Sequence, residues 1–327
     1  MRGFLTLVLI AVLAFAGWMA WALYTPVTPA QQTFVLLHPG YSTRRIASEL
    51  RAAGVIRSAT AFALWQRVHH AKSLKAGEYL FEKPATGIEI HERLVRGDVV
   101  IHTVVIPEGF NIFEIAQAIH EAGLGSAQDF LQVASDPGPI SDIAPNAKSL
   151  EGYLFPNTYE FTRTQTMQEM ATAMVKQFRQ VAREIGLNTD IESTVTLASI
   201  IEKETAAPEE RPVVASVYDN RMAKRVPLQA DPSVIYAELL QGAYSGALHH
   251  ADMQYRSDYN TYTHAGLPPG PIGNPGKTSL EAAMHPASTD YLYFVSDGNG
   301  HHRFARSLDE HSRNVAAYRR AKAAANR

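Results

Sequence analysis

The segment from Leu197 to Thr205 combines an apolar helical stripe with a carboxyl group that could act as a general acid. One face of the predicted helix, with residues three and four apart, consists of Leu197, Ile200, Ile201 and Glu204. Burial on that face disfavours the charged form of a carboxyl group, so we expect a raised pKa for Glu204. A glutamic acid with a pKa of roughly 6 is suited to protonate a glycosidic oxygen. Glu202 points elsewhere, so we expect Glu202 and Lys203 to be solvated.

A purely structural interpretation competes with this one. Glu204 could be the solvated end of a core helix, paired with an arginine, and composition alone favours that interpretation. The helical face therefore selects Glu204 among the nearby carboxyl groups but does not by itself establish a catalytic role.

Polar residues further along the chain could contact the hydroxyl groups of a sugar. They flank Pro232 or lie in the irregular stretch 252–275, and they are Gln229, Asp231, Tyr236, Asn260, Tyr262, Pro269 and Asn274. Tyr262 could stack on a sugar face, and the prolines at 268 and 269 would form a rigid wall. The alternative for each polar residue is a turn cap or a hydrogen bond within the loop. Glu151 is either an accessory carboxylate or a charge at a strand edge.

Several other chemistries have no support in the residue pattern. The chain has no cysteine, which excludes a disulfide scaffold, a thiolate nucleophile and a cysteine metal site. The sequence contains three histidine pairs, His69-His70, His249-His250 and His301-His302. None of them has the H-E-x-x-H spacing of a zinc site. The net charge of −2 gives no sign of nucleic-acid binding. The sequence therefore predicts no metal and no cofactor.

The N-terminal segment predicts a membrane anchor. Phe4 to Tyr24 contains no charged residue, and about 20 apolar residues suffice to cross a bilayer. Tryptophan and tyrosine gather at its far end, as in an aromatic belt, and Arg2 precedes it. The alternative is a signal peptide cleaved after Ala14-Phe15-Ala16. We expect residues 1–25 to form a cytoplasmic stub and a single transmembrane helix, and residues 26–33 to form a linker.

An internal repeat follows the anchor. Residues Gly40, Ile46, Leu50 and Gly54 recur 69 positions later as Gly109, Ile115, Ile119 and Gly123. The stretch 76–81 is echoed by 151–155, which predicts a closing strand at both places. Each unit has the pattern strand, turn, helix, helix, strand. We therefore expect a repeat region over residues 34–162, although a generic α+β unit could give the same pattern.

The C-terminal part, residues 163–327, has a different character. Apolar residues three or four apart predict helices from 166 to 185, 194 to 205 and 213 to 222. Another helix is expected at 279–284, and a hairpin pairs 291–295 with 302–305 across the turn 297–300. A polar helix ends the chain. Together with the repeats, these elements predict an α+β protein of about two domains.

Several longer runs resemble one known family. LASIIEKET, ERPVVASVYDNRM and PLQADPSVIYA are similar to the MltG (YceG-like) endolytic murein transglycosylases, as are EGYLFPNTYEF, YNTYTHAGLPPGPIGNPGKTSLEAAMHPA and YLYFVSDGNGHHRF. The matching runs are spread over residues 34 to 320. The repeat, with a strand, a Pro and Gly turn and a helix that ends in small residues, resembles the LysM-like units of cell-wall proteins. The resemblance to MltG implies that a catalytic domain with a lytic-transglycosylase-like helical core follows it. It also implies that Glu204 is the catalytic residue and that Glu204-Thr205 is similar to the Glu-Ser pair of other lytic transglycosylases.

The resemblance also implies a reaction and a place. The enzyme would cut the MurNAc–GlcNAc β-1,4 bond within nascent peptidoglycan glycan strands and leave 1,6-anhydroMurNAc ends. It would be anchored in the cell (inner) membrane with its catalytic part on the periplasmic or outer side, and peptidoglycan synthases would be its partners. Two alternatives stay open: a muramidase that adds water, with Asp231 or Glu151 as second carboxylate, and a non-catalytic glycan-binding scaffold.

Overall fold

The computed structural model describes residues 1–69 and 73–325, so His70 lies outside the described residues. The predicted α+β class is confirmed, since helices alternate with small two-stranded sheets. Contacts divide the chain into two compact units, Met1–Thr103 with Glu160–Thr166, and Val104–Tyr159 with Met167–Arg327. Most of the second repeat therefore shares a unit with the C-terminal part.

The first unit begins with α1 (Arg2–Tyr24), which is long and apolar enough to cross a membrane by length and composition. Ala22 and Leu23 in its last turn are buried against Ala61. The chain that follows is tied to the same unit, because Arg57 donates a hydrogen bond of 2.9 Å to the Pro26 carbonyl oxygen. The last turn of α1 is thus part of the core of this unit.

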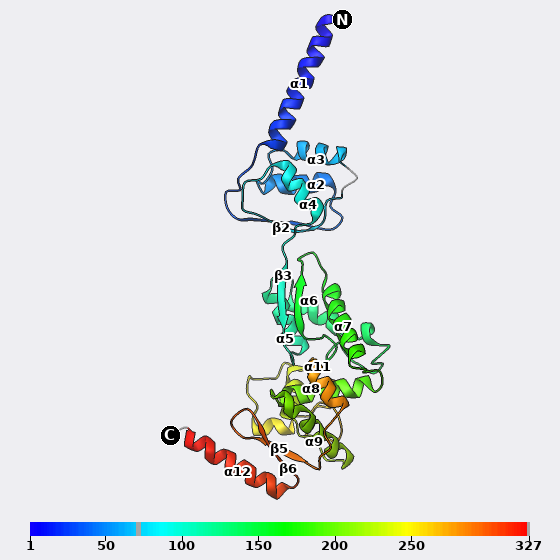
Figure 1. The fold of residues 1–327 in the computed structure, drawn as a ribbon, viewed down its shortest axis with the longest axis vertical. Helices are drawn as coiled ribbons and strands as arrows, with labels where there is room; N and C mark the ends of the chain where they lie inside the picture. The colour runs from blue at the N-terminus through cyan, green and yellow to red at the C-terminus, as the bar shows by residue number, and fades with distance from the viewer. Residues whose placement is uncertain (70–72, 326–327) are drawn as a thin grey trace. The chain divides into compact units, whose positions relative to one another are not determined.

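The first repeat consists of β1 (Thr33–Leu37), α2 (Thr43–Ala52), α3 (Ala59–Val68) and β2 (Gly77–Phe81), and α4 (Gly87–Arg96) follows it (Figure 1). β1 and β2 pair antiparallel, with Val35 opposite Tyr79. Ser42 caps α2 by accepting a hydrogen bond from the Arg45 backbone N–H, as Ser residues commonly do at helix N-termini. The apolar residues of both strands and all three helices meet in one core.

The second repeat consists of β3 (His102–Ile106), α5 (Ile112–Glu121), α6 (Ala127–Ala134) and β4 (Asn157–Phe161), with β3 paired to β4. The two repeats correspond in backbone detail. Gly40 and Gly109 have φ angles of 82° and 80°, and Gly54 and Gly123 have φ angles of 71° and 70°. These left-handed conformations favour glycine, which explains why glycine recurs at these positions.

The prediction of a closing strand at 151–155 is wrong. That stretch is a turn, and the strand of the second repeat is β4, which starts at Asn157. The Glu151 carboxylate does not lie at a strand edge, because it is buried and accepts a hydrogen bond of 2.9 Å from the Ile112 backbone N–H at the start of α5. This contact holds the segment as a turn against the helix.

The C-terminal part is mainly helical. Its helices are α7 (Met167–Glu184), α8 (Ile191–Glu204), α9 (Arg211–Ala223), α10 (Asp231–Leu239), α11 (Lys277–Met284) and α12 (Leu308–Ala325). A hairpin of β5 (Tyr293–Ser296) and β6 (His302–Ala305) confirms the predicted one, with Ser296 opposite His302. Short 3₁₀ turns cover Pro208–Glu210 and His250–Gln254, and a further one, Gly138–Ile140, precedes this part of the chain. The helix α10 was not predicted, and Pro232 lies within its first turn, where proline is tolerated.

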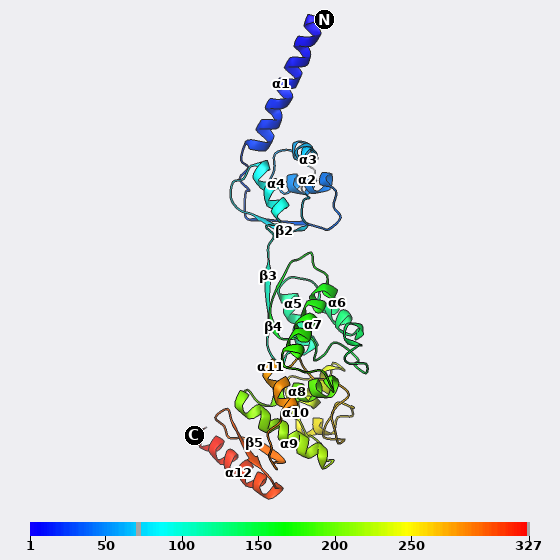
Figure 2. The same cartoon turned by 45° about the vertical axis from the view of Figure 1, so that its right-hand side comes forward.

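A compact core positions these elements. α8 packs against α9 and α11, and α12 lies beside β5 in both views (Figures 1 and 2). The buried residues at its centre include Leu197, Ile200 and Ile201 from the predicted face of α8. That face therefore turns inward and carries Glu204 to the edge of the core.

Candidate active site

Glu204 is the last residue of α8, and it lines a pocket of about 310 Å³. The pocket is lined by the end of α8, one face of α9, the start of α10, the β5–β6 hairpin and α12. Its lining residues are Glu204, Val217, Tyr218, Arg221, Leu228, Gln229, Asp231, Tyr262, Leu292, Tyr293, Phe294, Val295, His311 and Val315. The predicted catalytic glutamate therefore lines a pocket at which several elements meet.

The environment of Glu204 is that of a group that can hold and release a proton near neutral pH. Burial raises the pKa of Glu204 to about 7, which agrees with the direction expected from the helix face. The Tyr218 hydroxyl donates a hydrogen bond of 2.9 Å to Glu204 Oε1 and limits that rise. The charge of Asp231 raises the pKa further, and that of Arg221 lowers it.

Arg221 also fixes the walls of the pocket. Its Nε donates a hydrogen bond of 2.7 Å to the Leu292 carbonyl oxygen, beside the hairpin, and its Nη1 donates one of 2.7 Å to the Leu228 carbonyl oxygen. The guanidinium also lies 5.1 Å from the centre of the Tyr293 ring. A single buried cation thus joins α9 to the segments on either side of the pocket.

Three of the predicted sugar-binding residues line this pocket. Asp231 is the first residue of α10, and its Oδ1 accepts a hydrogen bond from the Tyr262 hydroxyl. Gln229 has a left-handed φ of 54°, and its backbone N–H donates to the Thr261 carbonyl oxygen over 3.0 Å. The structure therefore brings Gln229, Asp231 and Tyr262 together with Glu204.

The other predicted residues lie elsewhere. The buried amide of Asn260 bonds to the Met253 and Tyr255 carbonyl oxygens, which is the loop-internal alternative. Tyr236 is buried and hydrogen-bonded to Glu151. Asn274 is fully buried, with Oδ1 accepting from the Leu154 backbone N–H and Nδ2 donating to Glu151, both over 2.8 Å. Pro269 is exposed and lines two other hollows.

The expectation that Glu202 is solvated is wrong. Its side chain is 5 % exposed, and its Oε1 lies 2.6 Å from Arg211 Nη2. Its Oε2 accepts a hydrogen bond of 2.9 Å from the Gly276 backbone N–H. Lys203, by contrast, is exposed as predicted, and its Nζ lies 3.5 Å from Glu114 Oε2. The helix face separates Glu202 from Glu204 as predicted, but Glu202 enters a second buried site with Arg211 and Gly276, which belong to other elements.

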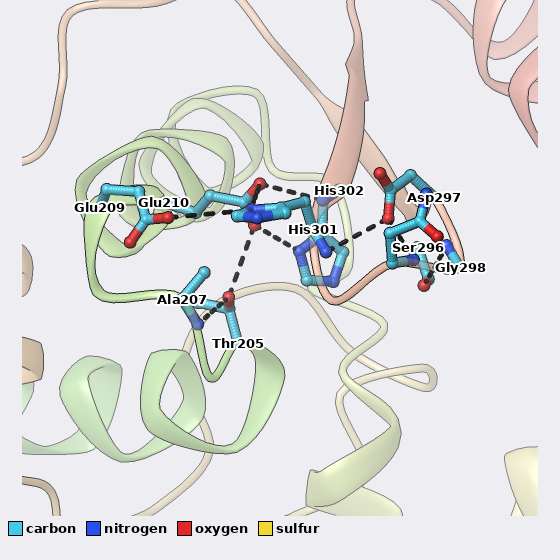
Figure 3. A network of polar contacts seen from close by, with 10 residues as sticks. Thr205, Ala207, Glu209, Glu210, Ser296, Asp297, Gly298, His301 and His302 are labelled. Atoms are coloured by element: carbon cyan, nitrogen blue, oxygen red, sulfur yellow. Dashed lines mark hydrogen bonds and ion pairs between the residues drawn. The ribbon is translucent and has the colours of Figure 1, made fainter.

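The hydroxyl that contacts Glu204 comes from Tyr218, whereas Thr205 turns away. Thr205 Oγ1 accepts a hydrogen bond of 3.1 Å from the Ala207 backbone N–H and faces Glu210 (Figure 3). Tyr218 and Arg221 were not predicted, although they lie three positions apart on one helix face within the run ERPVVASVYDNRM. Phe294 lies in the run YLYFVSDGNGHHRF and was not predicted either, whereas His311 lies in none of the runs that resemble the family.

Within residues 1–69 and 73–325, no three histidine and acidic side chains come together in a way that could hold a metal ion. The side chains that line the pocket around Glu204 can transfer a proton and form hydrogen bonds.

Two curated relatives resemble the chain over most of its length. Over 320 residues the chain is 33 % identical to the endolytic murein transglycosylase of Bacillus subtilis strain 168, covering 91 % of this chain and 88 % of the relative. Over 314 residues it is 30 % identical to the endolytic murein transglycosylase of Streptococcus pneumoniae strain D39, covering 85 % of this chain and 57 % of the relative.

A solved structure also resembles this chain over most of its length. The crystal structure of a YceG-like protein from Listeria monocytogenes is 32 % identical, with a TM-score of 0.57, and the match covers 86 % of this chain and 99 % of that one. The model of the YceG-like family matches residues 35–317, which include both repeats and the pocket. The chain belongs to the YceG-like family.

Proposed function

We propose that this chain is an endolytic murein transglycosylase, a lyase that cleaves peptidoglycan glycan strands, with Glu204 as its acid–base catalyst. The observation that carries the proposal is a partly buried glutamic acid that lines a pocket, accepts a hydrogen bond from Tyr218 and has a pKa raised to about 7. It occurs in a chain 33 % identical over nearly its whole length to the Bacillus subtilis endolytic murein transglycosylase.

In the first step, protonated Glu204 gives its proton to the oxygen of the MurNAc–GlcNAc β-1,4 bond. A glycosidase usually needs a second carboxylate as nucleophile or base. The substrate can supply that function here, because the 2-acetamido oxygen of N-acetylmuramic acid can attack its own anomeric carbon as the leaving group departs. The C–O bond breaks and Glu204 is left as a carboxylate.

In the second step, the Glu204 carboxylate removes the proton from the C6 hydroxyl of the same sugar. The C6 oxygen then bonds to the anomeric carbon and releases the acetamido group, giving a 1,6-anhydroMurNAc end without consuming water. One group acts first as acid and then as base, which requires an intermediate pKa. A value of about 7 meets that requirement.

The other pocket residues would bind the sugar. Asp231 and Gln229 are exposed at the pocket and can hydrogen-bond hydroxyl or amide groups. Tyr262 offers a ring for stacking on an apolar sugar face. We propose Gln229, Asp231 and Tyr262 as substrate-binding residues, within a catalytic region that spans residues 163–327.

Asp231 also supports a second candidate function. It lines the same pocket as Glu204 and affects its pKa, so it is the carboxylate that a water-adding muramidase would require. The hydrogen bond from Tyr262 occupies Asp231 Oδ1, which favours a binding role over that of a general base.

The N-terminal parts would place this chemistry at the membrane. We propose that α1 is a single-pass anchor in the cell (inner) membrane and that the catalytic part faces the periplasmic or outer side. The two repeats would act as LysM-like units that contact glycan or guide it to the pocket. Peptidoglycan synthases would be the protein partners, since the substrate is a strand in the course of synthesis.

The test uses the full-length chain in detergent micelles with purified peptidoglycan, beside a Glu204→Gln variant, with products read by mass spectrometry. We expect anhydromuramyl ends that the variant does not produce. Products heavier by one water would make the enzyme a muramidase and point to Asp231. Glycan binding without cleavage by the wild-type chain would favour a scaffold.

A further inference from the structure

Glu210 and His302 form a hydrogen-bonded pair that joins the chain just before α9 to the β5–β6 hairpin (Figure 3). His302 Nδ1 lies 2.7 Å from Glu210 Oε2, and the His302 backbone N–H donates to Oε1 over 2.9 Å. Burial opposes ionisation of Glu210, but the hydrogen bonds from His302 outweigh it, so the pKa of Glu210 lies below its usual value. Since an ionised carboxylate only accepts hydrogen bonds, His302 Nδ1 carries a proton.

The same carboxylate reaches the end of the helix that carries Glu204. Thr205 Oγ1 lies 3.5 Å from Glu210 Oε2, and Thr205 directly follows Glu204 in the chain. Thr205 is 2 % exposed and closes the turn after α8 through its bond from the Ala207 backbone N–H. Glu210 therefore touches both the end of α8 and the second strand of the hairpin.

His302 is also connected to Glu204 through two aromatic contacts and one hydrogen bond. The His302 and Phe294 rings lie edge to face, with centres 5.3 Å apart and planes at 85°. Phe294 in turn meets Tyr218 at 6.0 Å and 90°. Such edge-to-face contacts are favoured geometries for aromatic rings. Tyr218 donates its hydroxyl to Glu204 Oε1, which completes a path of contacts from Glu210 to Glu204.

We propose that Glu210 and His302 are positioning residues for Glu204. Their pair fixes the β5–β6 hairpin against the end of α8, so that Phe294 keeps Tyr218 where it hydrogen-bonds the acid. Neither residue of the pair is among those lining the pocket, so they act on the reaction without touching the substrate. This inference rests on the proposed function, because it takes Glu204 as the acid.

The hairpin offers a matched control beside the pair. His301 precedes His302 and also lies near Glu210, with Nδ1 3.4 Å from Oε1, but its side chain is 51 % exposed, against 13 % for His302. Its backbone N–H bonds to Asp297 in the hairpin turn. Replacing His301 tests the general effect of losing a histidine from this hairpin.

The experiment compares full-length wild-type, His302→Leu, His302→Asn and His301→Leu chains on purified glycan strands over a pH series. We expect His302→Leu to lower kcat by about 10-fold to 100-fold with little change in KM, because small displacements of catalytic groups have effects of that size. The pH at which kcat/KM begins to fall, which is set by the pKa of Glu204, should also differ from that of the wild-type chain. His302→Asn should restore much of kcat, since its amide N–H can replace Nδ1–H, and His301→Leu should match wild type.

Three results would overturn the inference. A wild-type kcat and pH profile in His302→Leu would show that the pair does not position Glu204. Equal losses in His302→Leu and His302→Asn, each matched by a lower unfolding temperature, would show a role in stability alone. If the wild-type chain cut no glycan, the proposed function would fail, and the positioning role would fail with it.

Discussion

Glu202 and Glu204 lie two positions apart on α8 and have opposite surroundings. Glu202 is ion-paired with Arg211 at 2.6 Å, whereas Glu204 receives a neutral hydrogen bond of 2.9 Å from Tyr218. A charged partner satisfies a buried carboxylate, while a hydroxyl leaves most of the cost of burying the charge in place. The first glutamate is therefore suited to hold structure, and the second to exchange a proton.

Replacing Glu204 by Gln should remove activity and raise stability. We expect kcat/KM to fall by about 10³-fold, since a positioned acid contributes on that order. The folded-state pKa of about 7 lies above the usual 4.5, so the contribution of this group to stability is greatest below pH 4.5 and is lost as the pH rises to 7. A neutral Gln avoids that loss, so the variant should gain about 1–3 kcal/mol at pH 8. Glycan-cleavage kinetics and urea unfolding measure both effects.

A Glu204→Gln variant that lost both activity and stability would contradict this account, because Glu204 would then be a structural group. The matched control is Glu209→Gln, which is a change of the same type at an exposed side chain. It should alter neither the kinetics nor the free energy of unfolding, since surface substitutions usually have small effects.

The activity of the wild-type chain should depend on pH through Glu204. The first step requires the protonated acid, and the pKa of Glu204 is raised to about 7. We therefore expect kcat/KM to be level below pH 7 on this limb and to fall about tenfold per pH unit above it. A pH series with a single glycan substrate measures the limb. A fall that began near pH 4.5 would mean that burial does not raise the pKa of the reacting group.

Replacing Tyr218 by Phe should move that limb to higher pH. The Tyr218 hydroxyl stabilises the charged form of Glu204, so its removal leaves burial less opposed and raises the pKa of Glu204 further. The pH dependence of kcat/KM measures the shift. Tyr236→Phe is the matched control, because Tyr236 is also buried and bonds to a glutamate, Glu151, that does not line the pocket. A limb that moved to lower pH, or moved equally in both variants, would contradict the role of Tyr218.

The sequence was sufficient for the features that depend on local periodicity. The face of α8 that carries Glu204 follows from residue spacing, and the repeat follows from glycines such as Gly40 and Gly109, which share a left-handed backbone conformation. The hairpin of β5 and β6 follows from a strand, a turn and a second strand that are adjacent in the chain. In each case one short stretch contains all of the information.

Features that depend on distant partners could not be predicted in this way. Glu202 is buried because Arg211 and the Gly276 backbone reach it from other elements. Asn274 looked like a sugar ligand, but its amide is used by Leu154, which is 120 positions away in the chain. Nothing in the spacing of these residues indicates such contacts, so polar residues in the irregular stretch could not be sorted into structural and functional ones.

Breaking the ion pair beside the active site should destabilise the fold. Arg211→Met leaves the buried Glu202 carboxylate without its cation, and the two side chains are only 6 % and 5 % exposed. We expect the free energy of unfolding to fall by about 3–5 kcal/mol, as for other buried pairs that lose one partner. Urea unfolding measures it. Arg179→Met removes an ion pair of the same 2.6 Å length whose Asp142 partner is 64 % exposed, so the loss of stability should be much smaller. Equal losses would show that burial of the pair is not what matters.

Asn274→Ala should separate a structural role from a sugar-binding one. The change removes the acceptor of the Leu154 backbone N–H and one donor to the buried Glu151, and unsatisfied buried groups cost about 1–3 kcal/mol each. We therefore expect the free energy of unfolding to fall by about 3 kcal/mol, with KM for glycan unchanged at a temperature where the variant is folded. Asn146→Ala, at an exposed asparagine, is the control and should leave stability nearly unchanged. A rise in KM without a loss of stability would instead return Asn274 to the substrate-binding residues, because its amide would then be available to the sugar.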